Sequence, residues 1–183
     1  MTLRIRRAAE ADLPGIIALI HLGALGGQGA EELGPPLPEA YYQAFREFSR
    51  YPEAKVLVAE LDGHVVGTFQ FHILPNLSNR ARPTAEVESV HVMEAVRGQG
   101  IGGAMMARAT EDARRLGCRR LQLTSNKARS DAHRFYERLG LVRSREGMKL
   151  SLWKSSQPPR TLRTTRAPAP ARGSLPAPAP CSP

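Results

Sequence analysis

The chain has 183 residues, and its 26 lysines and arginines outnumber its 17 aspartates and glutamates. That length fits one domain with a tail and leaves little room for a second core. The net charge of +9 suits a partner that carries phosphates, for which CoA, nucleic acid and acidic membrane surfaces all qualify. No apolar run is long enough for a membrane span or a signal peptide, so we expect no secretion and no membrane partner, and the two cysteines form no disulfide framework, which favours a cytoplasmic protein.

The composition changes near the end of the chain. Residues 155–183 hold eight of the 15 prolines, four arginines and no acidic residue. We therefore predict one domain over residues 1–154 and a disordered Pro/Ala/Arg-rich tail over 155–183. The two cysteines, Cys118 and Cys181, do not have a metal-binding spacing, and we expect no metal site.

The apolar spacing predicts alternating strands and helices. In chain order we predict a strand over 2–7, a helix from about residue 11, a helix over 39–50, strands over 55–61, 64–74 and 84–92, a helix ending at 116, a strand over 119–124, a helix over 130–139, and a hairpin of 141–144 and 148–153. Asp62-Gly63 is a strong hairpin signal, and the rings of the second helix are expected to be core. This order predicts an α/β fold with a mixed, mostly antiparallel sheet of about six or seven strands flanked by about four helices.

A glycine-rich turn stands between the strand that ends at Val92 and the next helix. It reads Arg97-Gly98-Gln99-Gly100-Ile101-Gly102-Gly103. Glycines let backbone N–H groups converge, and a helix N-terminus favours anions, so this turn can bind a pyrophosphate. The guanidinium of Arg97 can add a charge-assisted contact. The alternative is a glycine turn that binds nothing.

The same glycines satisfy the spacing of a dinucleotide-binding fingerprint. In that fingerprint, however, the glycines follow the strand directly and an acidic residue ends the next strand. Here residues 93–97 intervene, and the next predicted strand ends in Leu123-Thr124-Ser125. We therefore reject a dinucleotide-binding unit.

Two sequence blocks resemble the GNAT superfamily of N-acetyltransferases. Val90-His91-Val92 followed by the turn from Arg97 to Gly102 is similar to the family's acetyl-CoA motif. Asn126 with the segment 132–141, which contains Phe-Tyr and ends in Gly-Leu, is similar to its second block. Together the blocks span about residues 86–142. The resemblance implies a GNAT fold, acetyl-CoA as cosubstrate and an amine acceptor. A homodimer is common among such relatives, but this sequence does not show the oligomeric state.

The resemblance also implies roles for single residues. Val90 and Val92 would lie along the pantetheine of CoA, with the Val92 backbone N–H facing the thioester carbonyl. Tyr136 would protonate the departing thiolate, and the alternative is a structural tyrosine. Asn126 would contact the pantetheine or the neighbouring strand, or would simply end that strand.

Two carboxylates are candidates for the base that deprotonates the acceptor ammonium. Glu86 and Glu88 are two residues apart on a predicted strand, so we expect them to share one face with Val90 and Val92. Glu86 ranks first because its spacing from the Val90 motif resembles that of relatives. His91 is expected on the opposite face in a structural role.

The acceptor site is expected to come from residues 23–50 and 75–83. The run 131–136 resembles members that act on small amines, including aminoalkylphosphonate acetyltransferases. Arg80 or Arg82 could bind an anionic acceptor, or could pair with the two glutamates. We predict an acetyltransferase that moves an acetyl group from acetyl-CoA to a primary amine of a small molecule by direct attack in a ternary complex.

Three other functions stay open. One is a catalytically silent CoA-binding regulatory module, and a second is an acetyltransferase of protein N-termini or lysines. The third, which we favour least, is nucleic-acid binding through the basic charge, which would weaken steeply as salt rises.

Overall fold

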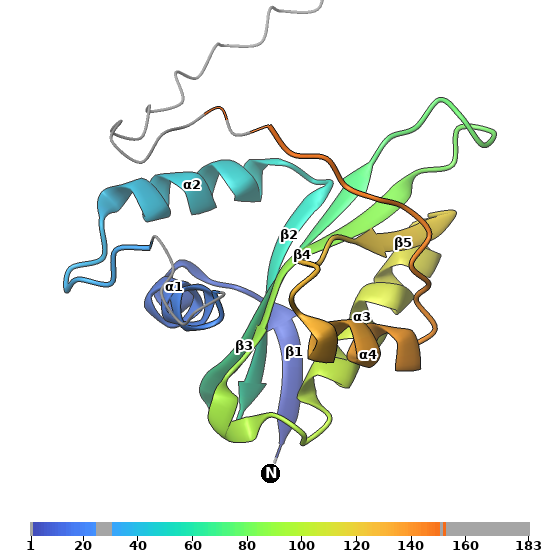
Figure 1. Cartoon of the computed structure of the whole chain (residues 1–183). Coiled ribbons are helices and arrows are strands. Elements are labelled where there is room, and N and C mark those ends of the chain that lie inside the picture. The colour runs from blue at the N-terminus through green and yellow to red at the C-terminus, as the bar shows by residue number, and fades with distance from the viewer. Residues whose placement is uncertain (1, 25–30, 151, 153–183) are drawn as a thin grey trace, which may run out of the picture. The chain divides into compact units, whose positions relative to one another are not determined.

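The computed structural model describes residues 2–24, 31–150 and 152. Within residues 1–149, which form one compact unit, a sheet lies between two pairs of helices (Figure 1). The described strands are, in spatial order, β1 (Leu3–Arg7), β2 (Ala54–Leu61), β3 (His64–Leu74), β4 (Thr84–Val92) and β5 (Arg120–Leu123). Neighbours are antiparallel except β4 and β5, which are parallel.

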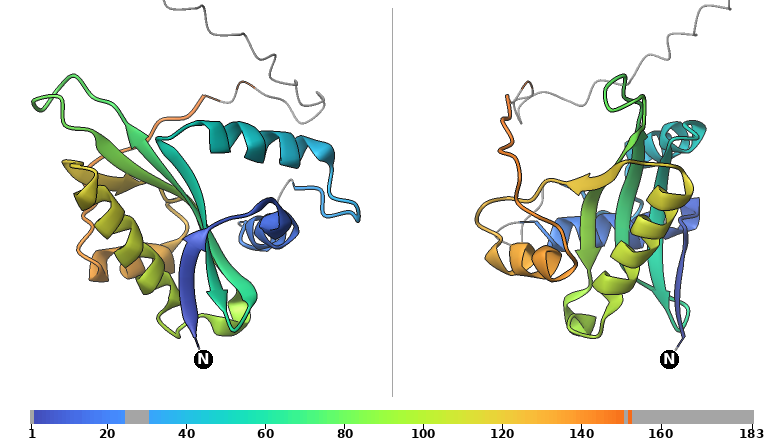
Figure 2. Two further views of the ribbon diagram at one scale, coloured as in Figure 1. Left: turned by 180° about the vertical axis from the view of Figure 1, so that it is seen from behind. Right: turned by 90° about the vertical axis from the view of Figure 1, so that its right-hand side faces the viewer.

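The helices cover both faces of the sheet (Figure 2). One face carries α1 (Leu13–Leu22) and α2 (Glu39–Arg50), and the other carries α3 (Ile101–Arg115) and α4 (Ser130–Arg138). Short 3₁₀ turns, Glu10–Asp12 and Glu94–Val96, precede α1 and α3. The predicted mixed α/β fold is thus confirmed, with five strands and four α-helices among the described residues. None of the described helices is long and apolar enough to cross a membrane.

The Asp62-Gly63 turn forms the predicted hairpin. It joins β2 to β3 with Leu61 opposite His64, and both turn residues have positive φ values of 48° and 86°, as a type I′ turn requires. The Asp62 carboxylate also accepts a hydrogen bond of 2.8 Å from the backbone N–H of Thr2. The turn therefore also fixes the start of β1.

Two apolar clusters hold the helices on the sheet. The larger lies under α3 and contains side chains that are almost fully buried, including Leu57, Phe69, Phe71, Val87 and Met105. The smaller joins α1 to α2, where the rings of Tyr41, Tyr42 and Phe45 pack against Leu13, Ile17 and Leu37. These three rings are partly buried and pack on the core, as expected, whereas Phe48 packs against the ring of His72 instead.

A buried carboxylate on α3 links this helix to β1 and β2, at the edge of the sheet away from β5. Asp112 is 1% exposed and forms ion pairs with Arg115, with Arg108 at 3.3 Å and with Lys55 of β2 at 3.7 Å. Arg108 also donates to the backbone oxygen of Ile5 on β1. A buried carboxylate requires such partners, and together they fix the position of α3 on the sheet.

The predicted closing hairpin is wrong in its described part. Residues 141–150 form no strand, and Val142 and Met148 are 80% and 97% exposed. The segment between them is charged and contains Gly147, so it offers no continuous apolar face. A hairpin without a packed apolar face is marginally stable. Residues 151 and 153 of the second predicted strand, and the predicted tail over 155–183, lie outside the described residues.

Candidate active site

The glycine turn leads from β4 into α3 as predicted. Gly98 and Gly100 have φ values of 80° and 82°, and a Cβ at either position would meet nothing within 4 Å, so glycine is needed for its backbone conformation. No side chain in the described part of the chain caps α3. The first N–H groups of a helix have no partner within the helix, and here they stay open to an anion beside the exposed Gln99.

Other residues of the turn have structural as well as binding roles. Ile101 is 3% exposed and lies in the core, so only its backbone can meet a ligand. A Cβ on Gly102 would lie 3.2 Å from the ring of Phe135, whereas one on Gly103 would meet nothing within 4 Å. Arg97 is exposed and folds back, with its Nε donating to the backbone oxygen of Val92 at 3.1 Å.

A β-bulge interrupts β4 before the turn. Gln70 of β3 pairs with Glu88, and Thr68 pairs with His91. Two residues of β4, Ser89 and Val90, therefore stand where β3 has only Phe69. Ser89 has a φ of 50°, in the left-handed region that β-bulges and turns use. Because one residue is extra, the alternation of side chains changes phase at this point.

The bulge overturns two predictions about β4. Glu88 lies on the face that α1 and α2 cover. Its side chain is beside His72 of β3, and the ring of His72 packs against that of Phe48 on α2 with 5.1 Å between the ring centroids. His91 lies on that face as well, not on the opposite one, and a Cβ on Gly23 after α1 would collide with its imidazole.

The side chains of Val90 and Val92 point the other way, into the core under α3. They do not share a face with Glu86 and Glu88, because the alternation that predicted it holds only in a strand without a bulge.

The backbone of Val92 faces the open edge of β4. The next residue, Met93, donates its N–H to Val66 on β3 at 2.8 Å. Successive residues of a strand direct their backbone groups to opposite edges, so Val92 directs its N–H away from β3. The pairing between β4 and β5 ends at Val87 and Leu123, and β5 does not reach this N–H.

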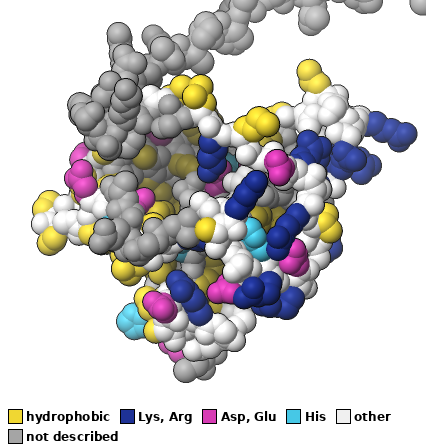
Figure 3. Space-filling view, viewed as in Figure 1, with side chains coloured by type: hydrophobic (Ala, Val, Ile, Leu, Met, Phe, Trp, Pro, Cys, Tyr) yellow, Lys and Arg dark blue, Asp and Glu magenta, His cyan; other side chains and the backbone are white. Residues whose placement is uncertain are grey.

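A cavity of about 270 Å³ opens where β4 and β5 separate. Its walls come from β4, the residues after β5, α4, and the residues after α1. Among the lining residues are Glu31, Glu88, His91, Asn126, Arg129 and Tyr136. Figure 3 views this side of the molecule, where Lys and Arg side chains gather over the part that carries α4 and the loop between β3 and β4.

Tyr136 lines this cavity from α4. Its ring packs edge-on against Phe135 with 5.1 Å between the ring centroids, and it contacts the core under α3. Burial raises the pKa of Tyr136, and the positive charge of Arg129 opposes this in part. The hydroxyl therefore stays protonated at neutral pH, as a proton donor must.

The two carboxylates predicted as bases occupy different places. Glu88 lines the cavity, and its Oε2 lies 3.9 Å from Nε2 of His72. Glu86 stands within the paired part of the sheet, with His72 on one side and Gln122 on the other, and does not line the cavity. The structure thus brings Glu88, but not Glu86, together with Tyr136.

Asn126 is at once a turn residue and part of the cavity wall. Its side-chain oxygen accepts a hydrogen bond of 2.9 Å from the N–H of Ala128, and its backbone oxygen accepts one from the N–H of Arg129. This Asx-type turn leads the chain into α4. The side-chain oxygen is therefore committed to the turn.

Sequence reasoning missed Arg129, which joins two distant parts of the site. Its guanidinium donates to the backbone oxygen of Gly23, just after α1. Burial and then the charge of Arg129 lower the pKa of His91, so that imidazole is neutral at pH 7. The contact links residues 106 positions apart in the chain, and no local spacing signals it.

Two histidine and glutamate pairs were missed as well. His72 stands beside Glu88, and Nδ1 of His21 lies 3.9 Å from Oε2 of Glu31. The ring nitrogens that face these carboxylates are buried and have no hydrogen-bond partner within the described residues. Each pair joins different elements, so only the folded chain reveals it.

Comparison with known proteins identifies the family. Residues 28–141 match the sequence profile of the acetyltransferase (GNAT) family. The chain is 37% identical over 110 residues to an aminoalkylphosphonate N-acetyltransferase of Salmonella typhimurium, over 58% of this chain and 71% of that protein.

Solved structures share the fold. A transcriptional regulator from Bacillus halodurans C-125 is 36% identical, with a TM-score of 0.78 over 82% of this chain and 99% of that one. A predicted acetyltransferase from Clostridium acetobutylicum, solved with acetyl-CoA, is 15% identical with a TM-score of 0.64 over 82% of this chain and 97% of that one, which shows likeness of fold alone. From its matched profile, its curated relative and its fold, the chain belongs to the GNAT acetyltransferase family and is an N-acetyltransferase.

Proposed function

We propose that this chain transfers the acetyl group of acetyl-CoA to the primary amine of a small molecule. The observation that carries this proposal is the cavity between β4 and β5, which both Glu88 and Tyr136 line. A group able to accept a proton and one able to donate it thus border the same space. The glycine turn at the start of α3 lies beside the open edge of β4.

The cosubstrate is proposed to bind by its phosphates and its pantetheine. The pyrophosphate binds the open N–H groups between Gly98 and Gly103, where the partial positive charge of α3 attracts an anion, and Arg97 adds a full charge. The pantetheine lies along β4 beyond Val87, where backbone groups no longer pair with β5. Asn126 forms the facing wall.

The reaction is proposed as a direct attack in a ternary complex. The amine nitrogen attacks the thioester carbon, the C–N bond forms, and the oxyanion accepts a hydrogen bond from the N–H of Val92. Glu88, directly or through water, takes the proton that the ammonium loses. The C–S bond then breaks, and the thiolate of CoA takes the hydroxyl proton of Tyr136. The phenolate of Tyr136 regains a proton from the nitrogen of the new amide, which loses its second proton in this step.

The size of the cavity supports a small acceptor. About 270 Å³ lies just below the range of about 300 to 1,000 Å³ that is typical of small-ligand pockets, which favours a small acceptor over a large one. The curated relative acts, by its name, on aminoalkylphosphonates, which are small amines that carry an anionic group. Peptide amines are the alternative acceptors.

The test is release of free thiol from acetyl-CoA with a panel of small amines, aminophosphonates and short peptides. We expect release that depends on the acceptor and that is cut by Glu88→Gln and by Tyr136→Phe. Micromolar binding of CoA without thiol release for any amine would contradict the proposal and indicate a CoA-binding regulatory module. Release with peptides alone would replace the small-molecule acceptor.

A further inference from the structure

The acceptor side of the cavity is acidic. Glu88 lines it from β4 and Glu31 lines it from the segment before α2. Glu86 stands on the same face of β4, two residues before Glu88. Among the described residues that line the cavity, Arg129 is the only lysine or arginine, and its guanidinium already donates to the backbone oxygen of Gly23.

The nearby histidines do not bond the carboxylates. His21 lies 3.9 Å from Glu31, and His72 lies 3.9 Å from Glu88, distances too long for a hydrogen bond. The third imidazole, His91, has a lowered pKa because it is buried near Arg129, so it adds no positive charge at neutral pH. The cavity lining therefore carries two carboxylates against the one guanidinium of Arg129, a formal charge of −1 among the described residues.

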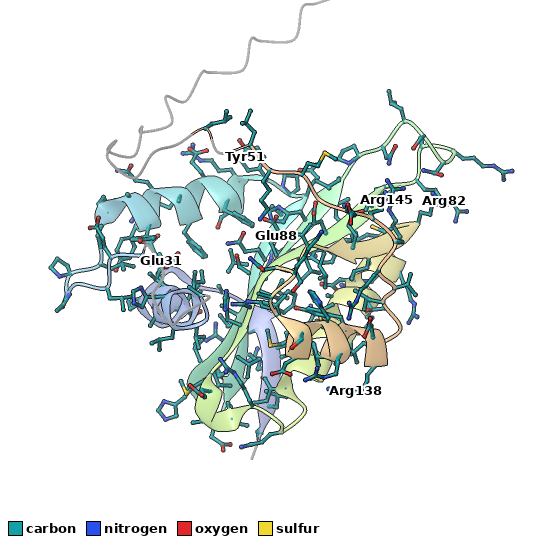
Figure 4. All side chains as sticks on the ribbon, in the orientation of Figure 1. Glu31, Tyr51, Arg82, Glu88, Arg138 and Arg145 are labelled. Carbon is teal, nitrogen blue, oxygen red and sulfur yellow. The ribbon has the colours of Figure 1, made fainter. Side chains whose placement is uncertain are left out.

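The arginines considered for an anionic acceptor lie elsewhere. Arg80 and Arg82 stand in the loop between β3 and β4, are exposed, and do not line the cavity. In Figure 4, Arg82 lies beside Arg145, on the far side of Glu88 from Glu31. No ion pair joins them to Glu86 or Glu88 within residues 31–150.

We infer that the acceptor is a small diamine, acetylated at one nitrogen beside Glu88 while the other nitrogen, as an ammonium, lies near Glu31. A narrow cleft lined by charges of one sign concentrates ligands of the opposite sign, and like charges across a binding site are unfavourable. A phosphonate or carboxylate in place of the second ammonium would face Glu31 with the same sign. This inference rests on the proposed acetyltransferase function and names its acceptor class.

The test compares acceptors that differ in one group. Values of kcat/KM are measured for 1,5-diaminopentane, for 5-aminopentan-1-ol, which replaces one ammonium with a neutral hydroxyl, and for 2-aminoethylphosphonate. The proteins are the full wild-type chain, Glu31→Gln, and Glu32→Gln as the matched control. Glu32 is exposed and adjacent, and the contact it makes with Tyr41 uses its backbone N–H.

We expect wild type to favour the diamine over the amino alcohol by about tenfold or more. Glu31→Gln should remove most of this preference by lowering kcat/KM for the diamine alone, and Glu32→Gln should behave as wild type. Equal turnover of diamine and amino alcohol, or a preference for the phosphonate, would overturn the diamine but keep the acetyltransferase. No turnover with any amine would overturn both. The wild-type comparison decides this even where a variant fails to fold.

Discussion

At the scale of residues, the site depends on where two ionisable side chains stand and on the form each takes at neutral pH. Tyr136 lines the cavity and is protonated, because burial raises its pKa. Glu88 borders the same cavity from β4 with its side chain 51% exposed, so water can carry protons to and from it. These positions lead to separate predictions.

Replacing Tyr136 with phenylalanine should separate proton donation from packing. Tyr136→Phe keeps the ring against Phe135 and removes only the hydroxyl. We expect kcat to fall about 100-fold while the Kd for acetyl-CoA, measured by calorimetry, stays the same. In the wild type, the alkaline loss of kcat should come above the ordinary tyrosine pKa of about 10. An unchanged kcat in the variant would remove Tyr136 from the reaction.

The choice of base can be decided by two matched variants. Glu88→Gln should lower kcat/KM about 100-fold, because its carboxylate borders the cavity, whereas Glu86→Gln should change it less than about threefold. Both rates come from thiol release with one amine under identical conditions. The reverse order would restore the ranking that sequence spacing favours and would require Glu86 to act through water.

Local patterns could predict one part of this site, and tertiary contacts decide the other part. The glycine turn and Tyr136 belong to continuous segments whose residue types show their chemistry. The bulge at Ser89 has no such pattern, because serine and valine both fit a regular strand, and so the face of His91 was predicted wrongly. Glu31 and Arg129 reach the cavity only through contacts between distant segments.

At the scale of elements, periodicity and turn residues predict most of the fold. The expected bounds of α2, β3 and β4 are those observed, because each is bounded by Pro, Gly or a polar loop. The prediction of a closing hairpin was wrong, because alternating apolar residues form stable strands only where they can pack against an apolar surface. The contact between α3 and α4 could not be predicted either. It depends on Gly102, whose missing side chain lets the ring of Phe135 on α4 come close to α3.

Gly102 and Gly103 allow a test of that contact. Gly103→Ala meets nothing within 4 Å and should stabilise the helix by about 0.5 to 1 kcal/mol. Gly102→Ala places a Cβ 3.2 Å from the ring of Phe135, which should cancel that gain and destabilise the protein by about 1 kcal/mol. Urea unfolding of both variants measures the difference. If both variants were stabilised equally, α4 would be able to shift away from the new methyl group at residue 102 without a loss of stability.

At the scale of the whole molecule, ion pairs join the N-terminal strand to the rest. Arg6 bonds the carboxylate of Asp12 at 2.6 Å and that of Glu60 at 2.7 Å. Asp12 also accepts from the backbone N–H of Ala9. This cluster connects β1, β2 and the start of α1, and it makes stability depend on pH.

The sign of that dependence follows from Asp12. Its hydrogen bond with Arg6 lowers its pKa, so its contribution to stability is complete above the ordinary value of about 3.9 and is lost as pH falls through the lowered value. Asp12→Asn should cost about 1 kcal/mol at pH 7 and flatten the fall in stability below pH 4. Thermal unfolding from pH 7 to pH 2 checks this, with the exposed Glu111→Gln as control. The same acid slope in both variants would contradict it.

The separation of β4 from β5 has a consequence for the lifetime of the protein. Beyond Val87, the edge of β4 that faces away from β3 pairs with no strand among the described residues, and the proposed ligand would complete its backbone hydrogen bonds. A ligand that binds only the folded chain stabilises it by mass action. The supply of the proposed cosubstrate would then raise the abundance of the protein as well as its rate, because a chain without that ligand would unfold more often and meet proteases sooner.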